Sequence, residues 1–365
     1  MPMVIVGTPA RPRGLECAAG GTTMNHRILA ITAVDHPGGA EASLMRLLAG
    51  LGRRGWAVAL TTPGGGPLRD AALAAGYEWH ALPLGGLKRR TGARAIASWA
   101  TASRLAWRAD VVYLNSGVCG RLIPALALLR RRGRPRLVLH VHDMVKRVPS
   151  FWRKADVVLA DSAAVARRLG DLHANVVYCP VDPDPPAAAA PWPTGTGPVV
   201  GFVGRLEPRK GPLDLVHAAP AIRRGCPDAR IVVVGDDPYD GSPEYTRQVL
   251  ASDQVEHHGW HANAPGLMRH LDVLVLPSYE EPFGTVLAEA MAVGTPVVAT
   301  AVDGLPEVVR DGITGRLVRP GEPDELAAAV LEVLARRQEM GPAAREQARR
   351  FNTADYIDRV EALIS

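Results

Sequence analysis

Two glutamates and a glycine form the densest group of candidate functional residues. Glu281 follows an apolar run, Gly284 opens the next helical segment, and Glu289 lies about one and a half turns inside it. The free N–H groups of Gly284, Thr285 and Val286 at a helix N-terminus form an anion site. Carboxylates on both sides can accept hydrogen bonds from ligand hydroxyls. The segment predicts a site for a phosphorylated, hydroxyl-rich ligand, although each glutamate alone also fits a cap or a solvated position.

A second group follows the apolar run 199–203. Arg205 offers a planar fork for phosphate oxygens, and Lys210 offers a compact charge for a second phosphate. The chain has only four lysines, Lys88, Lys146, Lys154 and Lys210, so a lysine here favours a specific role. A surface turn with incidental charge would also account for these residues in isolation. With the glutamates, they predict a diphosphate site.

The motifs of several enzyme classes are absent from this sequence. The sequence holds no GxxxxGK[ST] of P-loop proteins, no GxGxxG after a strand, no HExxH and no GxSxG. Two sets of residues match metal-ligand types by count, Asp182 with Asp184, and His257 with His258 and His261. The aspartates lie in a proline-rich connector and the histidines in a predicted ligand-edge loop, so no metal site is predicted.

Short apolar runs alternate with helical patterns, which is typical of parallel, doubly wound sheets. The predicted strands are 27–32, 57–62, 110–115, 136–142, 156–160, 175–179, 199–203, 230–234, 272–277 and 296–301. The predicted helices include 40–54, 91–108, 212–223, 285–293 and 324–337. A proline-rich stretch interrupts the pattern at 180–198 and cannot hold a helix or a central strand. We therefore expect two Rossmann-like halves, with ligands at the carboxyl ends of the strands.

Three segments carry a family resemblance: GFVGRLEPRKG at 201–211, DVLVLPSYEEPFGTVLAEAMAVGTPVVAT at 272–300, and GLPEVVRDGITGRLVRPG at 304–321. Together they resemble the retaining family 4 glycosyltransferases, which are two-domain GT-B enzymes with an E-x7-E pair. Here the pair is Glu281 and Glu289. The first half matches less closely, through Gly38-Gly39-Ala-Glu41 and LVLHVHD at 137–143.

The resemblance implies a role for each residue of the second half. Arg205 and Lys210 would bind the donor diphosphate and stabilise it as it leaves. Glu289 would hold the nucleotide ribose, and Glu281 would contact the transferred sugar. The amides of 284–286 would bind the distal phosphate and the sugar.

The resemblance also assigns residues of the first half. The backbone of Gly38 and Gly39 would approach the diphosphate from the opposite domain. His142 would face the sugar and the reaction centre, with His140 as the competing choice. Retention would proceed by same-face attack, with the leaving phosphate accepting the acceptor's proton. The donor is then the co-substrate, and neither a metal nor a further cofactor is expected.

Five segments are expected along the chain. They are a disordered extension at 1–23, an acceptor-binding domain at 24–182, a linker at 183–198, a nucleotide-sugar-binding domain at 199–351, and a helix at 352–365 that crosses back to the first domain. Four scattered cysteines without a CxxC pair, and no signal-peptide pattern, predict a cytoplasmic protein. No apolar run approaches the ~18 residues that a membrane span needs, so none is expected.

The net charge of +5, from 42 basic and 37 acidic residues in a chain of 365, is too small to predict nucleic-acid binding. The expected donor carries UDP, GDP or ADP, and the expected acceptor is a soluble small molecule of specialised metabolism. A basic, tryptophan-containing helix is expected at 88–108. Such a helix could make weak contact with a membrane, so a lipid or polysaccharide acceptor is the alternative. A non-catalytic nucleotide-sugar-binding subunit or a sugar-nucleotide epimerase would share the expected architecture.

Overall fold

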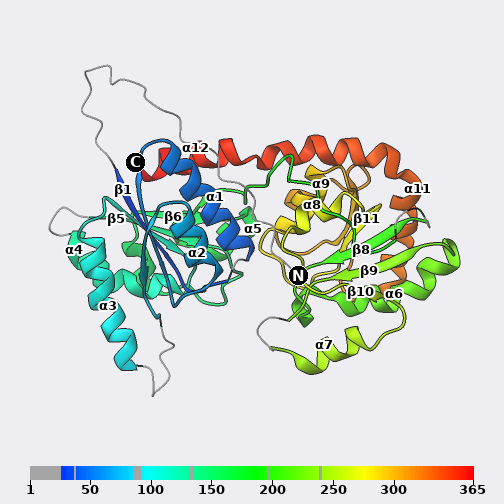
Figure 1. Cartoon of the computed structure of the whole chain (residues 1–365), viewed down its shortest axis with the longest axis horizontal. Helices are drawn as coiled ribbons and strands as arrows, with labels where there is room; N and C mark the ends of the chain where they lie inside the picture. The colour runs from blue at the N-terminus through cyan, green and yellow to red at the C-terminus, as the bar shows by residue number, and fades with distance from the viewer. Residues whose placement is uncertain are drawn as a thin grey trace, which may run out of the picture.

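A computed structural model describes residues 26–36, 38–84, 92–130, 135–193, 195, 197–237 and 241–365. The expected extension at 1–23 lies outside these residues. The chain forms two α/β domains side by side, and helices α11 (Pro323–Ala348) and α12 (Thr353–Ile364) run along one side of both (Figure 1). Within the described residues, no helix combines the length and apolarity needed to cross a membrane.

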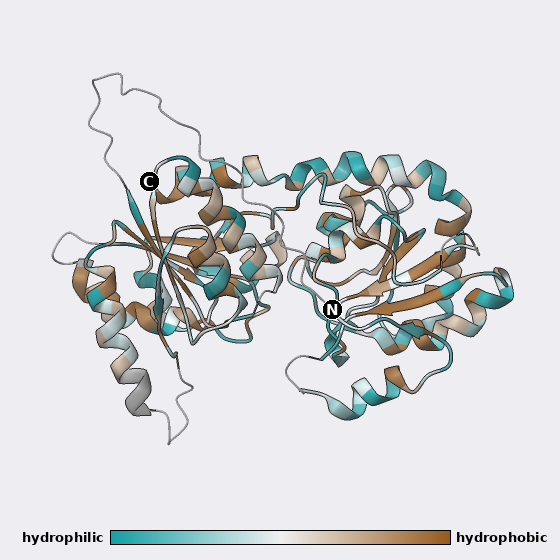
Figure 2. Cartoon of the chain, viewed as in Figure 1, coloured by the Kyte–Doolittle hydropathy of each residue, from teal (hydrophilic) through white to brown (hydrophobic). Residues whose placement is uncertain are grey.

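The first domain is built on a seven-stranded parallel sheet in the order β3-β2-β1-β4-β5-β6-β7. The strands are β1 Arg27–Thr32, β2 Ala57–Thr62, β3 Glu78–Ala81, β4 Val111–Asn115, β5 Arg136–Val141, β6 Val157–Ala160 and β7 Asn175–Val176. Alternate residues of β1 join two separate clusters, Leu29 and Ile31 on one face and Ile28 and Ala30 on the other. The sheet is therefore buried on both faces, as Figure 2 shows by the brown strands inside each domain.

Helices cover both faces of this sheet. They are α1 Gly39–Arg53, α2 Pro67–Ala74, α3 Gly92–Ala106, α4 Ile123–Arg130 and α5 Ala163–Leu169. The C-terminal α12 also packs here, because Tyr356, Ile357 and Val360 share a buried cluster with Leu44 and Leu47 of α1.

The second domain repeats the design with a six-stranded parallel sheet in the order β10-β9-β8-β11-β12-β13. The strands are β8 Val199–Val203, β9 Arg230–Val234, β10 Glu256–His257, β11 Val273–Leu276, β12 Val297–Thr300 and β13 Gly315–Val318. The helices are α6 Pro212–Gly225, α7 Pro243–Leu250, α8 Ala264–Met268, α9 Thr285–Ala292, α10 Leu305–Val308 and α11.

The predicted fold class, two doubly wound parallel sheets, is confirmed, but the predictions missed three strands. The missed strands are β3, β10 and β13, which lie at sheet edges and have two to four residues each. Their polar residues, such as Glu78 and His80 in β3, break up the apolar run that marks a central strand.

Helix α11 is longer than predicted, because it continues past Gly341 and Pro342 to Ala348. Met340 and Ala344 are fully buried on either side of this break, so packing outweighs the local signal to stop. A Cβ on Gly341 would lie 2.7 Å from the carbonyl oxygen of Gly294. The glycine therefore permits the close approach that fixes this part of the helix.

The proline-rich linker is bound to the second domain. Trp192 is buried in that domain's core, and four side chains donate hydrogen bonds to linker carbonyls at 2.6 to 2.8 Å: Arg230 to Pro193, Asn263 to Pro186, Arg269 to Pro185 and His270 to Ala188. These hydrogen bonds satisfy linker carbonyls that have no partner in a helix or a sheet.

Candidate functional site

The two charged groups of the second domain meet at one edge of its sheet. The loop after β8 carries Lys210 and the loop after β11 carries Glu281, and these two strands are neighbours. The Lys210 ammonium forms an ion pair with the Glu281 carboxylate. Ser278 also donates to Glu281 at 3.4 Å. Both charges are mostly buried, with 15% of the lysine side chain and 7% of the glutamate side chain exposed.

Backbone contacts hold the two loops together. Tyr279 N donates to the Arg209 carbonyl at 2.8 Å, and the Arg209 guanidinium donates to the Glu280 carbonyl at 3.0 Å. Arg205 lies further out, with 44% of its side chain exposed, and pairs with Glu207 at 3.2 Å. The exposed position leaves the Arg205 guanidinium accessible to a ligand at the rim of this edge.

Helix α9 begins at Thr285, four residues after Glu281. Gly284 precedes it with φ +88°, the left-handed conformation that only glycine adopts easily, and a Cβ there would lie 2.5 Å from Leu305. The preceding Phe283 is 2% exposed and packs against Tyr178 and Phe351 at ring distances of 5.6 and 5.2 Å. An aromatic cluster thus anchors the loop that presents the α9 N-terminus.

Glu289 contacts the first domain. Its carboxylate lies 3.5 Å from the guanidinium of Arg46 on α1, and Arg46 also donates to the Pro180 carbonyl at 2.7 Å. Burial raises the pKa of Glu289, while Arg46 opposes this rise. Arg46 therefore stabilises the ionised carboxylate, the form that best accepts hydrogen bonds from hydroxyls.

The glycines of the first domain lie opposite α9. A Cβ on Gly39 would be 3.5 Å from the Thr285 hydroxyl, which places the start of α1 against the start of α9. Gly38 precedes α1 in extended conformation, and Glu41 in the first turn of α1 is buried, which raises its pKa. The structure thus brings Gly39 and Thr285 together across the two domains.

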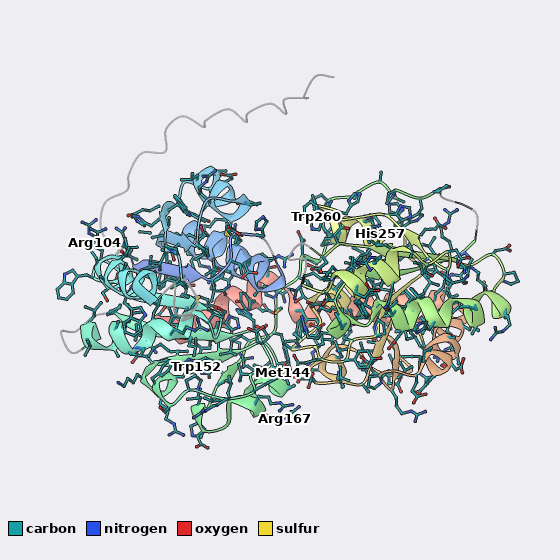
Figure 3. The ribbon with its side chains drawn as sticks, turned by 90° about the horizontal axis from the view of Figure 1, so that it is seen from below. Arg104, Met144, Trp152, Arg167, His257 and Trp260 are labelled. Atoms are coloured by element: carbon teal, nitrogen blue, oxygen red, sulfur yellow. The ribbon has the colours of Figure 1, made fainter. Side chains whose placement is uncertain are left out.

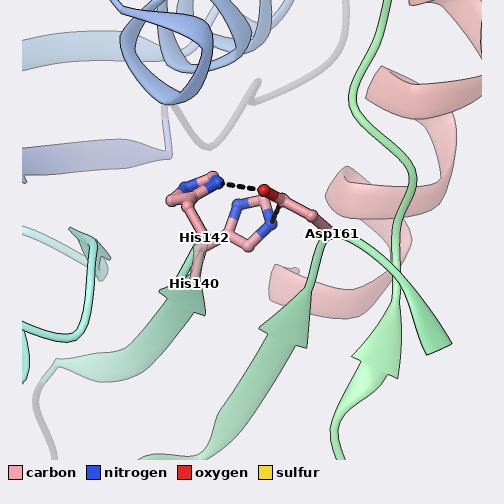
Figure 4. A group of neighbouring side chains, drawn as sticks. All are labelled: His140, His142 and Asp161. Atoms are coloured by element: carbon pink, nitrogen blue, oxygen red, sulfur yellow. Dashed lines mark hydrogen bonds and ion pairs between the residues drawn. The ribbon is translucent and has the colours of Figure 1, made fainter. Parts of the chain in front are cut away.

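His142 lies just beyond β5 in a buried polar cluster (Figure 4). Its Nδ1 is 2.9 Å from Asp161 Oδ2 and its Nε2 is 2.9 Å from Asn115 Oδ1. His140 points to the same carboxylate, with Nε2 2.9 Å from Asp161 Oδ1, and the Tyr113 hydroxyl is 2.6 Å from His140 Nδ1. His142 therefore contacts groups of its own domain.

The cluster shifts the pKa values of the two histidines in opposite directions. Burial and the charge of His142 lower the pKa of His140 to about 4. Burial also opposes the charge on His142, but the adjacent Asp161 outweighs it and raises the pKa of His142. Burial disfavours the Asp161 carboxylate too, yet the two histidines hold its pKa below the ordinary value. These opposite shifts favour the proton on His142 rather than on His140, with the Asp161 carboxylate between the two rings.

The same cluster is the group of potential metal ligands in the described part of the chain. The ligand atoms of His140, His142 and Asp161 lie within 4.8 Å of one another. Each Asp161 oxygen already lies 2.9 Å from an imidazole nitrogen. The His142 contact is a hydrogen bond and the His140 contact is a close polar contact, so histidines of the same domain approach both carboxylate oxygens.

The loop after β10 forms another part of the second domain's edge, where His257 and Trp260 lie close together in Figure 3. Trp260 is 64% exposed, and its backbone N–H donates to Asp236 at 2.8 Å. His257 lies 2.8 Å from the Gly235 carbonyl. A cavity of about 280 Å³ lies elsewhere, between the linker and α11, and none of the predicted site residues lines it.

Sequence reasoning missed several residues of the site. They are Arg46, Asn115, Asp161, Ser162 and Glu307, which contact predicted residues or the loops that carry them. Asp161 had a usable signal, because it directly follows the predicted strand 156–160 at the edge where His142 ends its own strand. Arg46 had none, because it is one of many arginines on helical segments.

Two parallel-sheet domains with this C-terminal crossover define the GT-B fold. HepE of Anabaena, solved with UDP and glucose, matches it with a TM-score of 0.76 and 23% identity over 92% of this chain and 98% of that chain. Residues 37–185 match the family model "Glycosyltransferase Family 4", and residues 197–336 match "Glycosyl transferases group 1". The two family models thus match the two domains in chain order.

Two curated relatives are called D-inositol 3-phosphate glycosyltransferase. The protein of Segniliparus rotundus is 39% identical over 174 residues, which is 44% of this chain and 38% of that protein. The protein of Mycobacterium bovis is 35% identical over 245 residues, which is 63% of this chain and 48% of that protein. The matches thus span less than half the length of these relatives.

Proposed function

We propose that this protein is a retaining, metal-independent glycosyltransferase that uses a nucleotide diphosphate sugar. The observation that carries the proposal is the meeting of Lys210 with Glu281 beside the α9 N-terminus, where Glu289 follows in the same helix. Cationic groups, backbone N–H groups and two carboxylates thus lie on one edge of one sheet. A sugar diphosphate presents the matching phosphates and hydroxyls.

The chemistry of this edge suits the departure of a diphosphate. When the bond between the anomeric carbon and the phosphate oxygen breaks, negative charge grows on the leaving group. Lys210, Arg205 and the α9 N-terminus provide preorganised positive charge there, in a largely buried setting. In the retaining route the leaving phosphate accepts the proton of the acceptor hydroxyl, which attacks from the same face. Lys210 therefore has two anionic partners, Glu281 in this structure and the diphosphate in the reaction.

The first domain supplies the other side of the reaction centre. Asp161 favours the protonated form of His142, and in the proposed complex His142 faces the transferred sugar. The acceptor is a small molecule bound by this domain. The name of the curated relatives, D-inositol 3-phosphate glycosyltransferase, supports an acceptor of this size. The UDP found with HepE makes UDP the first donor nucleotide to test.

An acceptor in a membrane is the second candidate. Trp99 on α3 is 38% exposed, Trp107 just after it is 47% exposed, and Leu128 on the neighbouring α4 is 62% exposed. Arg104 adds charge to α3 and is labelled in Figure 3. Residues 88–91 of the predicted basic helix lie outside the described residues. Binding to anionic vesicles that falls with salt, and is lost in Trp99→Ala/Trp107→Ala, would favour this acceptor class.

The experiment that tests the proposal is a donor panel. The protein is incubated with UDP-, GDP- and ADP-sugars and mixed small-molecule acceptors, and the release of nucleoside diphosphate is measured together with the anomeric configuration of the product. We expect one nucleotide class to support transfer with retained configuration. Tight nucleotide binding without transfer or hydrolysis across the panel would favour a non-catalytic binding subunit.

A further inference from the structure

Three consecutive residues, Ser162 to Ala164, connect the two domains where β6 leads into α5, and Asp161 directly precedes them. Asp161 is 3% exposed and holds His142 and His140 through its two oxygens. The next residue, Ser162, is fully buried, and its hydroxyl donates to the carbonyl of Pro282 at 2.6 Å. Pro282 lies between Glu281 and Phe283 in the loop that precedes α9. Two neighbouring residues just after β6 thus contact His142 and the loop proposed to bind the donor.

Glu307 of α10 adds a second contact from the other domain. Its oxygens accept hydrogen bonds from Ala163 N at 2.8 Å and Ala164 N at 2.9 Å. The Tyr178 hydroxyl donates to the same carboxylate at 3.2 Å. A carboxylate from the second domain therefore binds the first turn of a helix of the first domain, in addition to the Ser162 contact. Hydrogen bonds from three consecutive residues, Ser162, Ala163 and Ala164, thus fix the relative position of the domains at this point.

The covalent link between Asp161 and Ser162 makes these contacts interdependent. When the domains separate, Ser162 loses its hydrogen bond to the Pro282 carbonyl, and the first turn of α5 loses its hydrogen bonds to Glu307. Ser162 also caps α5, because its oxygen accepts from Val165 N at 3.1 Å. A shift of Ser162 therefore moves the backbone of Asp161, to which it is bonded. The Asp161 carboxylate then moves as well, and this carboxylate orients the ring of His142.

We propose that Asp161 and Ser162 are positioning residues for glycosyl transfer, and that they align His142 with the donor loop when the two domains are in contact. Asp161 orients the ring of His142 and keeps the proton on Nδ1. Ser162 ties that orientation to the Pro282 carbonyl, next to Glu281. The inference rests on the proposed function, because it assigns His142 and Glu281 to one reaction centre.

Two pairs of variants separate this role from general stability. Ser162→Ala removes the hydroxyl, whereas Ser162→Thr keeps a donor to Pro282 and an acceptor for the helix cap. Asp161→Asn keeps the shape of Asp161 but removes its charge. We expect Ser162→Ala and Asp161→Asn to lower kcat at least about tenfold, because each weakens or removes a buried hydrogen bond. Ser162→Thr should restore most of the rate. Nucleoside diphosphate affinity should stay unchanged, since the residues proposed to bind it lie in the second domain.

The decisive readout is the nitrogen resonances of the His142 ring, assigned by comparison with His142→Gln. Asp161→Asn should lower the pKa of the ring; the other groups that face it are Asn115 on β4, Glu41 on α1, and His140 and Asp143 on the β5 segment. Addition of whichever of UDP, GDP or ADP binds should shift these resonances in the wild type and in Ser162→Thr. In Ser162→Ala the same saturation should leave them unshifted.

The outcomes distinguish this proposal from the function on which it rests. A His142 response in Ser162→Ala equal to that of the wild type, or a kcat unchanged in both Ser162→Ala and Asp161→Asn, would overturn the positioning role while transfer activity stands. A loss of nucleotide affinity that accounts for the whole loss of rate would overturn it as well. If none of the three nucleotides binds the wild type, the proposed function itself fails and this role fails with it.

Discussion

The pair formed by Arg46 and Glu289 gives a prediction in which charge, rather than shape, determines donor affinity. Their atoms are 3.5 Å apart, and 23% and 16% of the two side chains are exposed. At this distance the attraction is at most about 5 kcal/mol with an effective dielectric constant near 20. Burial already raises the pKa of Glu289. Removal of Arg46 should raise this pKa further and shift the carboxyl towards its neutral form.

The perturbation is Arg46→Met, which keeps the length of the aliphatic stem. A ribose hydroxyl bonds to a carboxylate more strongly than to a neutral carboxyl, by about 1 to 1.5 kcal/mol. The Kd of the nucleoside diphosphate should therefore increase roughly tenfold at neutral pH. The affinity should recover as the pH rises through the pKa of Glu289, because the ionised form returns. The wild type should keep its affinity down to a lower pH than the variant, because Arg46 opposes the rise in the pKa of Glu289.

Isothermal titration calorimetry from mildly acidic to alkaline pH measures this effect. Arg46→Lys should restore much of the affinity, and Arg53→Met, at an exposed position of the same helix, serves as the matched control. Thermal unfolding of each variant checks that the loss of the Arg46 bond to Pro180 has not disrupted the fold. An affinity for Arg46→Met equal to that of the wild type at every pH would refute the reasoning.

Three further predictions concern the same two domains. Lys210→Ala should lower the rate of nucleoside diphosphate release by about 10²- to 10³-fold, and a loss below tenfold would argue against its role at the leaving group. Transfer should survive dialysis against EDTA, because Lys210, Arg205 and the α9 N-terminus supply the positive charge; a loss reversed by a divalent cation would contradict metal independence. The free energy of unfolding should decrease as the pH falls from about 6.5 to about 4, because burial lowers the pKa of native His140 to about 4 while the unfolded chain takes up the proton. Chemical denaturation should show a smaller decrease in His140→Gln, and an equal decrease would contradict this source.

The central strands were predictable from the sequence because burial on both faces leaves a continuous apolar run. Strands β1, β2, β8 and β9 have the predicted ends. Edge strands such as β3 lack that signal, since one side of the strand has no partner in the sheet and polar residues are tolerated there. The end of α11 was not predictable from the sequence either. The packing of Met340 and Ala344 outweighs the tendency of Gly341 and Pro342 to end the helix. Local patterns carry no information on such long-range packing.

The pairing of Lys210 with Glu281 follows from strand order. Each residue lies just after a strand, and β8 and β11 are neighbours, so two motifs 71 residues apart meet at one edge. The contacts of Arg46, Ser162 and Glu307 depend on how the two domains lie against each other. No local pattern encodes that arrangement, which is why these residues emerge only from the structure.

The central claim is that the edge carrying Lys210, Glu281 and α9 binds and releases a nucleoside diphosphate during sugar transfer. The most direct test is the release of nucleoside diphosphate from the donor panel by the wild type and by Lys210→Ala. We expect release with one nucleotide class by the wild type and a strong loss in the variant. Release that does not depend on Lys210, or no binding and no release with any donor, would contradict it.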